Sequence, residues 1–235
     1  MMLKIFISEK MKFKKICYFI PLISSLILIL FTCIEWYGYF RKTSVGIYGV
    51  FNVLYLFLPF MMLLTITILS SIIAEIEHKA GAWKVIFSLP LRQSKIYICK
   101  LIWISLFMLE TCSLSIVGLI ILWLIYTSEP LPFIFLVKQV IGCFLASFTA
   151  LTIQLFISIS ISNQAIPLTI GVIGGASSLT LARSKIEYLH WLPWTYPSLA
   201  TPFIENYKMW IIVSIIFGIF FSVISSVMFE KSEFK

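Results

Sequence analysis

The stretch that decides the fold is residues 74–100, AEIEHKAGAWKVIFSLPLRQSKIYICK, the longest polar interruption in an otherwise apolar chain. Four apolar residues in its first half recur at helical spacing: Ile76, Ala80, Trp83 and Phe87. This spacing predicts a short helix with one apolar stripe, with Glu75 and Lys79 as an i,i+4 ion pair. Pro90 would end the helix, because it has no N–H and disfavours α geometry in the residue before it. The pattern predicts a helix lying along the membrane face; a plain connecting loop with positive charge is the alternative.

The composition of the chain excludes a soluble domain. Of its 235 residues, 60% are hydrophobic and only 12% are charged, whereas about a quarter of the residues of a soluble protein are charged. The net charge of +8 comes from basic residues in short loops and tails, which indicates membrane topology rather than nucleic-acid binding. The chain is therefore expected to be a polytopic membrane protein.

Residues that commonly serve in catalysis or metal binding are also scarce in this sequence. The chain contains no Asp, only two His, and five Cys without C-x-x-C spacing. The two histidines are predicted on opposite sides of the membrane, and the cysteines are expected to be reduced, buried thiols. There is no phosphate-binding motif. We therefore expect no enzyme active site, no metal site and no bound cofactor.

The apolar runs predict an all-α protein with a single transmembrane domain over residues 1–235. Six transmembrane helices are expected, at about residues 16–36, 50–74, 101–126, 139–161, 165–182 and 209–229. Residues 1–15 combine five lysines with apolar side chains, which is typical of an interfacial helix or elbow. Residues 75–100 connect spans two and three, and residues 183–208 form a loop rich in Trp, Tyr and Pro.

Six spans place both termini on one side of the membrane. With that side cytoplasmic, about two-thirds of the 18 Lys and Arg residues lie inside, which agrees with the bias of membrane proteins toward positive cytoplasmic segments. The charge distribution therefore predicts cytoplasmic termini and a cytoplasmic loop over residues 75–100.

Two kinds of residue stand out within the spans. Gly171 and Gly175 form a G-x-x-x-G pattern, which predicts close packing against another helix, in this chain or in a second one. Glu110 and Gln154 are polar residues inside apolar runs. Each is either a polar contact on a transport route or a neutral group hydrogen-bonded to a neighbouring side chain.

Residues of the polar stretch resemble a known family. The matching positions are Glu77, Gly81, Trp83-Lys84, Ser88-Leu89-Pro90, Ile96-Tyr97 and Lys100. Together they resemble the cytoplasmic loop of ABC-2 type permeases, where E-x-x-x-G-x-W-K is followed by L-P and I-Y-x-x-K. The similarity is strongest to the small permease subunits of lantibiotic immunity exporters, and it extends to chain length, six-span layout and the late aromatic loop.

The resemblance implies a half-transporter of the bacterial cell membrane without an ATPase site of its own. It would work with two copies of a separate ATP-binding subunit and with a second permease chain, identical or different. The helix between spans two and three would be the coupling helix, with six candidate coupling residues: Glu77, Gly81, Trp83, Lys84, Phe87 and Pro90. Trp83 would be the central anchor, with Glu77 and Lys84 pairing at the rim of the contact.

The substrate implied by the resemblance is a lantibiotic or a similar amphipathic antimicrobial peptide, removed from the membrane to give self-immunity. Export of another hydrophobic compound is one alternative, and a membrane scaffold or sensor without transport activity is another. A secondary transporter driven by an ion gradient would usually show inverted repeats and broken helices with polar midplane residues, which are mostly lacking in this sequence.

Overall fold

The computed structural model describes residues 2–42, 46–81 and 93–231, which form a helical bundle. The first half of the bundle is built from α1 (Met2–Lys12), α2 (Lys15–Gly38), α3 (Gly49–Lys79) and α5 (Gln93–Tyr126). The second half is built from α6 (Phe133–Ala146), α7 (Phe148–Ser160), α8 (Ala165–Leu181) and α10 (Tyr207–Lys231). Short helices η1 (Phe40–Lys42), η2 (Gly46–Tyr48), η3 (Glu187–Trp191) and α9 (Tyr196–Leu199) lie in the connections.

Within these residues, five helical segments are long and apolar enough to cross a membrane. They are Lys15–Gly38, Gly46–Lys79, Gln93–Tyr126, Phe133–Ser160 and Tyr207–Glu230. The fifth predicted span, 165–182, corresponds to α8, an apolar helix of only 17 residues. At about 1.5 Å per residue, α8 is about 25 Å long, shorter than the roughly 30 Å hydrocarbon core of a bilayer.

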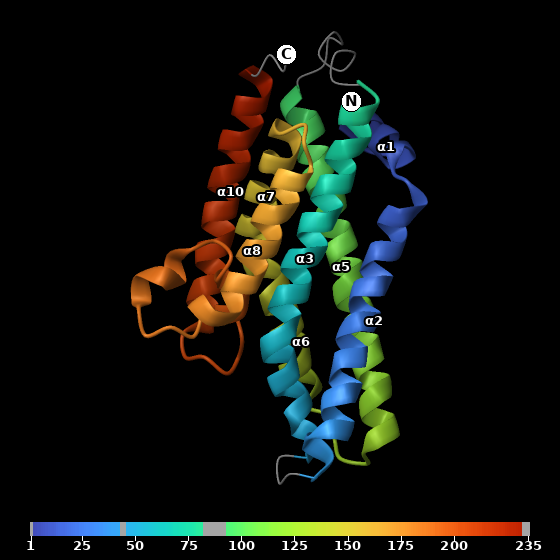
Figure 1. Cartoon of the computed structure of the whole chain (residues 1–235), viewed down its shortest axis with the longest axis vertical. Helices are drawn as coiled ribbons and strands as arrows, with labels where there is room; N and C mark the ends of the chain where they lie inside the picture. Colours follow the sequence, from blue (N-terminus) through green and yellow to red (C-terminus); the bar gives the residue numbers. More distant parts are fainter. Residues whose placement is uncertain (1, 43–45, 82–92, 232–235) are drawn as a thin grey trace.

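Helices α2, α3 and α5 run the length of the bundle, with α1 at one end (Figure 1). The last residues of α3, the first residues of α5 and the C-terminal end of α10 lie at this same end, called here the α1 end. Helix α3 packs against α2, α7 and α8, whereas α10 packs against α5, α6 and α7. The first described helix and the last residues of α10 therefore lie at the same end of the bundle.

Helices α3 and α5 extend beyond the predicted spans 50–74 and 101–126. The last turn of α3 carries the predicted ion pair, with Lys79 Nζ 2.7 Å from Glu75 Oε1. Helix α5 begins at Gln93, eight residues before the predicted start of the span. Charged residues mark where an apolar run ends, but a helix continues as long as its backbone hydrogen bonds are made.

The segment between α5 and α8 contains a break that the sequence did not predict. Helix α6 ends at Ala146 and α7 starts at Phe148, so Ser147 interrupts the span. Ser214 of α10 fills the gap, because its Oγ donates to the Ala146 carbonyl at 2.6 Å and accepts from the Thr149 N–H at 3.3 Å. A side chain inserted into the backbone ladder is a common cause of such a break.

The aromatic connection between α8 and α10 bulges from one side of the bundle (Figure 1), and its short helix α9 packs against α6 and α10. The Tyr196 hydroxyl donates to the Trp191 carbonyl at 2.8 Å, and the Tyr196 ring stacks on Trp210. Gly142 of α6 permits the close approach, because a Cβ there would lie 2.9 Å from the Ala200 carbonyl oxygen. The loop predicted at 183–208 therefore has two parts: residues 195–201 are buried against the bundle, whereas most of residues 183–192 are exposed or only partly buried.

Candidate functional site

Four charged side chains from three helices meet at the α1 end and form what we call the ionic cluster: Glu9, Lys12, Glu77 and Lys100. Lys100 Nζ lies 2.6 Å from Glu9 Oε2 and 2.8 Å from Glu77 Oε1. Lys12 Nζ lies 3.0 Å from Glu77 Oε1 and also pairs with Glu9, one turn away on α1. The cluster thus joins α1 to the end of α3 and the beginning of α5.

The cluster is buried and balanced in charge. The Glu9, Glu77 and Lys100 side chains are at most 2% exposed, whereas the Lys12 side chain is 36% exposed. Isolated buried charges are strongly unfavourable, and two carboxylates facing two ammonium groups remove most of that cost. Removal of any one member would leave an uncompensated charge in the interior.

The surroundings shift the pKa of Glu9 and of Lys12, the two residues that α1 contributes to the ionic cluster. Burial alone would raise the pKa of the Glu9 carboxyl, but Lys100 and Lys12 outweigh this effect and hold it below its ordinary value. Burial alone would lower the pKa of the Lys12 amine, but Glu77 and Glu9 outweigh it and hold the pKa above its ordinary value. Both groups therefore stay charged around neutral pH.

Aromatic contacts hold α1 against α5 beside the cluster. The Phe6 ring stacks on the Trp103 ring, with centroids 4.4 Å apart, and Trp103 Nε1 donates to the Phe6 carbonyl at 3.0 Å. Phe13 meets the same indole edge-on at 5.4 Å. The elbow predicted at residues 1–15 is thus a helix fixed by an apolar contact and an ionic one.

Helix α3 ends two residues before Gly81, and this glycine explains why. Gly81 has a φ of +57°, a conformation that L side chains rarely adopt, and its N–H bonds to the His78 carbonyl at 3.2 Å. The prediction of one continuous helical stripe from Ile76 to Phe87 is wrong, because α3 stops at Lys79 and the backbone turns left-handed at Gly81.

The end of α3 and the first described turns of α5 lie together at the α1 end, where the ionic cluster joins them. Tyr97 anchors the first turns of α5, because its buried hydroxyl donates to the Thr152 carbonyl of α7 at 3.0 Å.

Comparison with known families gives one match. The sequence model of the ABC-2 family transporter proteins matches residues 5–178, which is more than half of the 235-residue chain. The chain belongs to the ABC-2 family. No curated protein and no solved structure matches it.

ABC-2 permeases are transmembrane components of transporters. They are generally not catalytic themselves and normally work with an ABC ATP-binding subunit. The family and the apolar helices together make this chain a multi-pass membrane protein. Among the residues that the structure describes, no group of three His, Cys, Asp or Glu side chains could hold a metal ion.

The candidate coupling residues of this ABC-2 protein fall into two groups. Trp83, Lys84, Phe87 and Pro90 lie outside the described residues. Gly81 ends α3, and Glu77 is buried in the ionic cluster instead of lying at an exposed rim, bonded to Lys100 and Lys12.

The two glycines predicted for close packing lie on the face of α8 that contacts α3 of the same chain. A Cβ on Gly171 would lie 2.8 Å from the Thr67 Cβ and closer still to the Thr67 hydroxyl, so no larger residue fits without a shift. A Cβ on Gly175 would lie 3.5 Å from the Leu63 Cβ, an ordinary van der Waals distance. Of the two glycines, Gly171 is therefore the one at which α3 approaches α8 more closely.

The two polar residues proposed for a transport route lie in different surroundings. Gln154 is buried, and its amide donates to the Pro167 carbonyl at 2.8 Å, linking α7 to α8. Glu110 is exposed on the outer face of α5 and has no hydrogen-bond or ion-pair partner within the described parts of the chain. The structure does not bring these two side chains into one site.

The ionic cluster, the most concentrated group of charges among the described residues, was not predicted from the sequence. Glu9 is a single acidic residue among five lysines in residues 1–15, so it did not stand out. Lys100 was noted only as part of a motif. One signal was present: Glu9 and Lys12 are three residues apart, and both Glu77 and Lys100 lie within one or two turns of an apolar run.

Proposed function

We propose that this ABC-2 protein is the membrane subunit of an ATP-driven exporter and receives movement from a separate ATP-binding subunit at its α1 end. The contact would be made by the segment between α3 and α5, with Trp83 as the anchor. The chain would be a half-transporter that acts with a second permease chain and two ATP-binding subunits.

The observation that carries this proposal is the ionic cluster. It ties the last turn of α3, the beginning of α5 and α1 into one unit through four ion pairs, three of them with N···O separations of 2.6 to 3.0 Å. A force applied between α3 and α5 would act on all three helices together, since separating any pair would expose a buried charge. A contact that must transmit movement needs such a rigid support.

The proposed topology has six crossings with both termini in the cytoplasm. The common position of α1 and the C-terminal end of α10 supports an even number of crossings. The short α8 would be the remaining crossing, completed by the connection that folds back between α8 and α10. The positive charge of residues 1–15 and 75–100 supports a cytoplasmic α1 end.

For the substrate we propose an amphipathic antimicrobial peptide of the lantibiotic type. The support is the resemblance of the motif residues in 77–100 to immunity permeases, together with the large apolar surface that the chain exposes along α2, α5 and α10. Such surfaces lie in contact with lipid, where an amphipathic peptide partitions.

The experiment that tests the coupling is the Trp83→Ala variant, co-expressed with its ATP-binding subunit. Loss of a hot-spot anchor of about 2 kcal/mol weakens docking roughly 30-fold. We expect normal abundance in the membrane, reduced co-purification of the ATP-binding subunit and loss of tolerance to the peptide in cells.

Trp191→Ala is the matched control, because Trp191 is exposed in the connection between α8 and α10. It should retain the ATP-binding subunit. If Trp83→Ala also retains the subunit and full export, the segment between α3 and α5 is only a connector, and the coupling proposal fails.

A further inference from the structure

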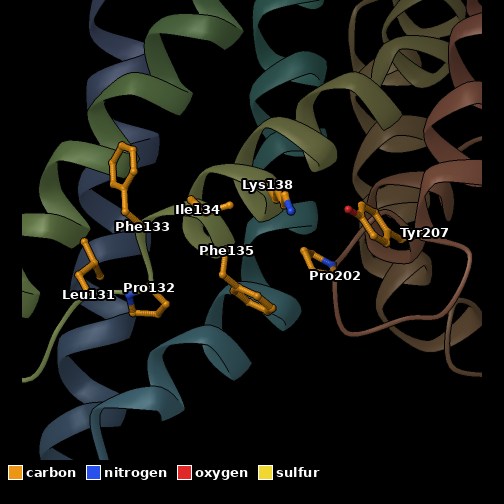
Figure 2. A pocket seen from close by; sticks show the side chains of 8 residues that line it. All are labelled: Leu131, Pro132, Phe133, Ile134, Phe135, Lys138, Pro202 and Tyr207. Carbon is orange, nitrogen blue, oxygen red and sulfur yellow. The ribbon is translucent and has the colours of Figure 1, made fainter.

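A pocket of about 710 Å³ lies away from the ionic cluster, between the turn after α5, the first turns of α6 and the start of α10. Its walls are mostly apolar: Leu131, Pro132, Phe133, Ile134, Phe135 and Pro202. Two polar side chains, Lys138 and Tyr207, complete the lining. Figure 2 shows the Lys138 amine and the Tyr207 hydroxyl directed toward each other.

With the α6–α7 segment centred in a bilayer, helix length places the pocket near the boundary between the hydrocarbon core and the headgroups. The α6–α7 segment has 28 residues, about 42 Å at 1.5 Å per residue, against a hydrocarbon core of roughly 30 Å. About 6 Å at each end therefore lies in the headgroup region, and Lys138, five residues after the start of α6, lies close to that boundary. A lysine at this depth extends its amine toward the headgroups.

The charge of Lys138 is not used inside the protein. Lys138 is exposed and has no ion-pair partner in the parts of the chain that the structure describes. Glu205 and Lys208 flank Tyr207 along the chain, but neither lines the pocket. The polar part of the pocket therefore offers one ammonium group and one hydroxyl, both of which donate hydrogen bonds to an anion.

We propose that this pocket binds an anionic phospholipid, with the phosphodiester held by Lys138 and Tyr207. The apolar wall suits the glycerol backbone and the first carbons of the acyl chains, and Phe133 and Ile134 are both exposed to them. A zwitterionic headgroup fits less well, because its own cation would lie near the Lys138 amine. The site does not depend on the proposed coupling to an ATP-binding subunit.

The test uses the purified full chain in neutral detergent and compares phosphatidylglycerol with phosphatidylcholine of identical acyl chains by native mass spectrometry. We expect the wild type to bind phosphatidylglycerol more tightly and to gain thermal stability from it, since a ligand that binds the folded state stabilises it. In Lys138→Gln the affinity for phosphatidylglycerol should fall about fivefold, the effect of one basic residue near an anionic surface. Lys138→Arg should retain binding, and Tyr207→Phe should lose part of it.

Lys208→Gln is the matched control, because Lys208 is exposed beside Tyr207 and does not line the pocket. An equal loss in Lys208→Gln and Lys138→Gln would overturn the proposal in favour of unspecific surface charge. Equal binding of the two lipids by the wild type would also overturn it. Displacement of the lipid by soluble glycerol phosphate would overturn the phospholipid assignment, since the anion alone would then suffice.

Discussion

Helix α5 carries two charged residues ten positions apart that have opposite surroundings. Lys100 is buried and faces two carboxylates, whereas Glu110 lies exposed on the outer face without a partner in the described parts of the chain. Both interrupt an apolar helix, and both would be costly if left charged in hydrocarbon. The contrast teaches that a charge in a membrane helix becomes part of the fold only when residues distant in sequence supply its counter-charge.

The largest effect on stability is expected from Lys100→Met. This substitution removes the main counter-charge of two buried carboxylates and so leaves them poorly paired, as Glu110 is. The substitution leaves Glu9 and Glu77 buried with only the half-exposed Lys12 between them. Breaking a buried pair by removing one partner typically costs about 3–5 kcal/mol. The free energy of unfolding should fall by that amount, measured by denaturation in detergent micelles.

Lys95→Met is the control for this prediction, because Lys95 is a half-buried cation of the same helix outside the cluster. It should change the stability by no more than about 0.5 kcal/mol. Adding Glu9→Gln to Lys100→Met should recover part of the loss, since one uncompensated charge is removed. Equal losses in the two lysine variants would show that the cluster contributes no stability.

An intermediate effect on stability is expected from acid, which neutralises the Glu9 carboxylate of the cluster. Because the pKa of Glu9 in the folded protein lies below its ordinary value of 4.5, the folded state binds the proton less tightly than the unfolded state. The contribution of Glu9 is therefore complete above about pH 4.5 and is lost as the pH falls through the folded pKa.

The measurement is the melting temperature of the wild type and of Glu9→Gln between about pH 7 and pH 3.5. The wild type should lose more stability on acidification than the variant, which has no carboxyl to protonate at this position. Parallel pH profiles would exclude Glu9 as a source of the acid sensitivity.

The smallest effect is expected from Glu110→Gln on the outer face of α5. No partner in the described parts of the chain is lost, and the side chain keeps its shape, so the free energy of unfolding should change by less than about 0.5 kcal/mol. Ser113→Ala, one turn further along the exposed face, is the control. A loss above about 1 kcal/mol in Glu110→Gln would mean that Glu110 has a partner within the folded chain.

Much of the architecture could be predicted from the sequence, because the length of an apolar run is enough to predict a membrane helix. The predicted spans 16–36 and 209–229 differ from α2 and α10 by only a few residues at each end. The prediction was weaker where a helix continues beyond its apolar run, as at the extended ends of α3 and α5. It failed at Ser147, because the break there depends on Ser214, a residue of another helix.

The site was harder to predict than the fold for the same reason. The apolar stripe predicted from Ile76 to Phe87 does not include Glu77, and the resemblance placed Glu77 at the rim of the coupling contact, so an exposed position was expected. Its burial depends on Lys100 and Lys12, which are 23 and 65 residues away. Gly171, in contrast, was identified from a local pattern, since small residues four apart are sufficient to bring two helices together.

The ionic cluster also imposes an order on the synthesis of the protein. Glu9 and Lys100 are separated by 91 residues, so at roughly 5–20 residues per second the ribosome needs about 5 to 18 s to supply the partner. During that time Lys12 is the only one of the two partners of Glu9 that has been synthesised, so the carboxylate is not yet fully compensated. Helix α1 can therefore complete its contacts with the bundle only after the beginning of α5 has been synthesised.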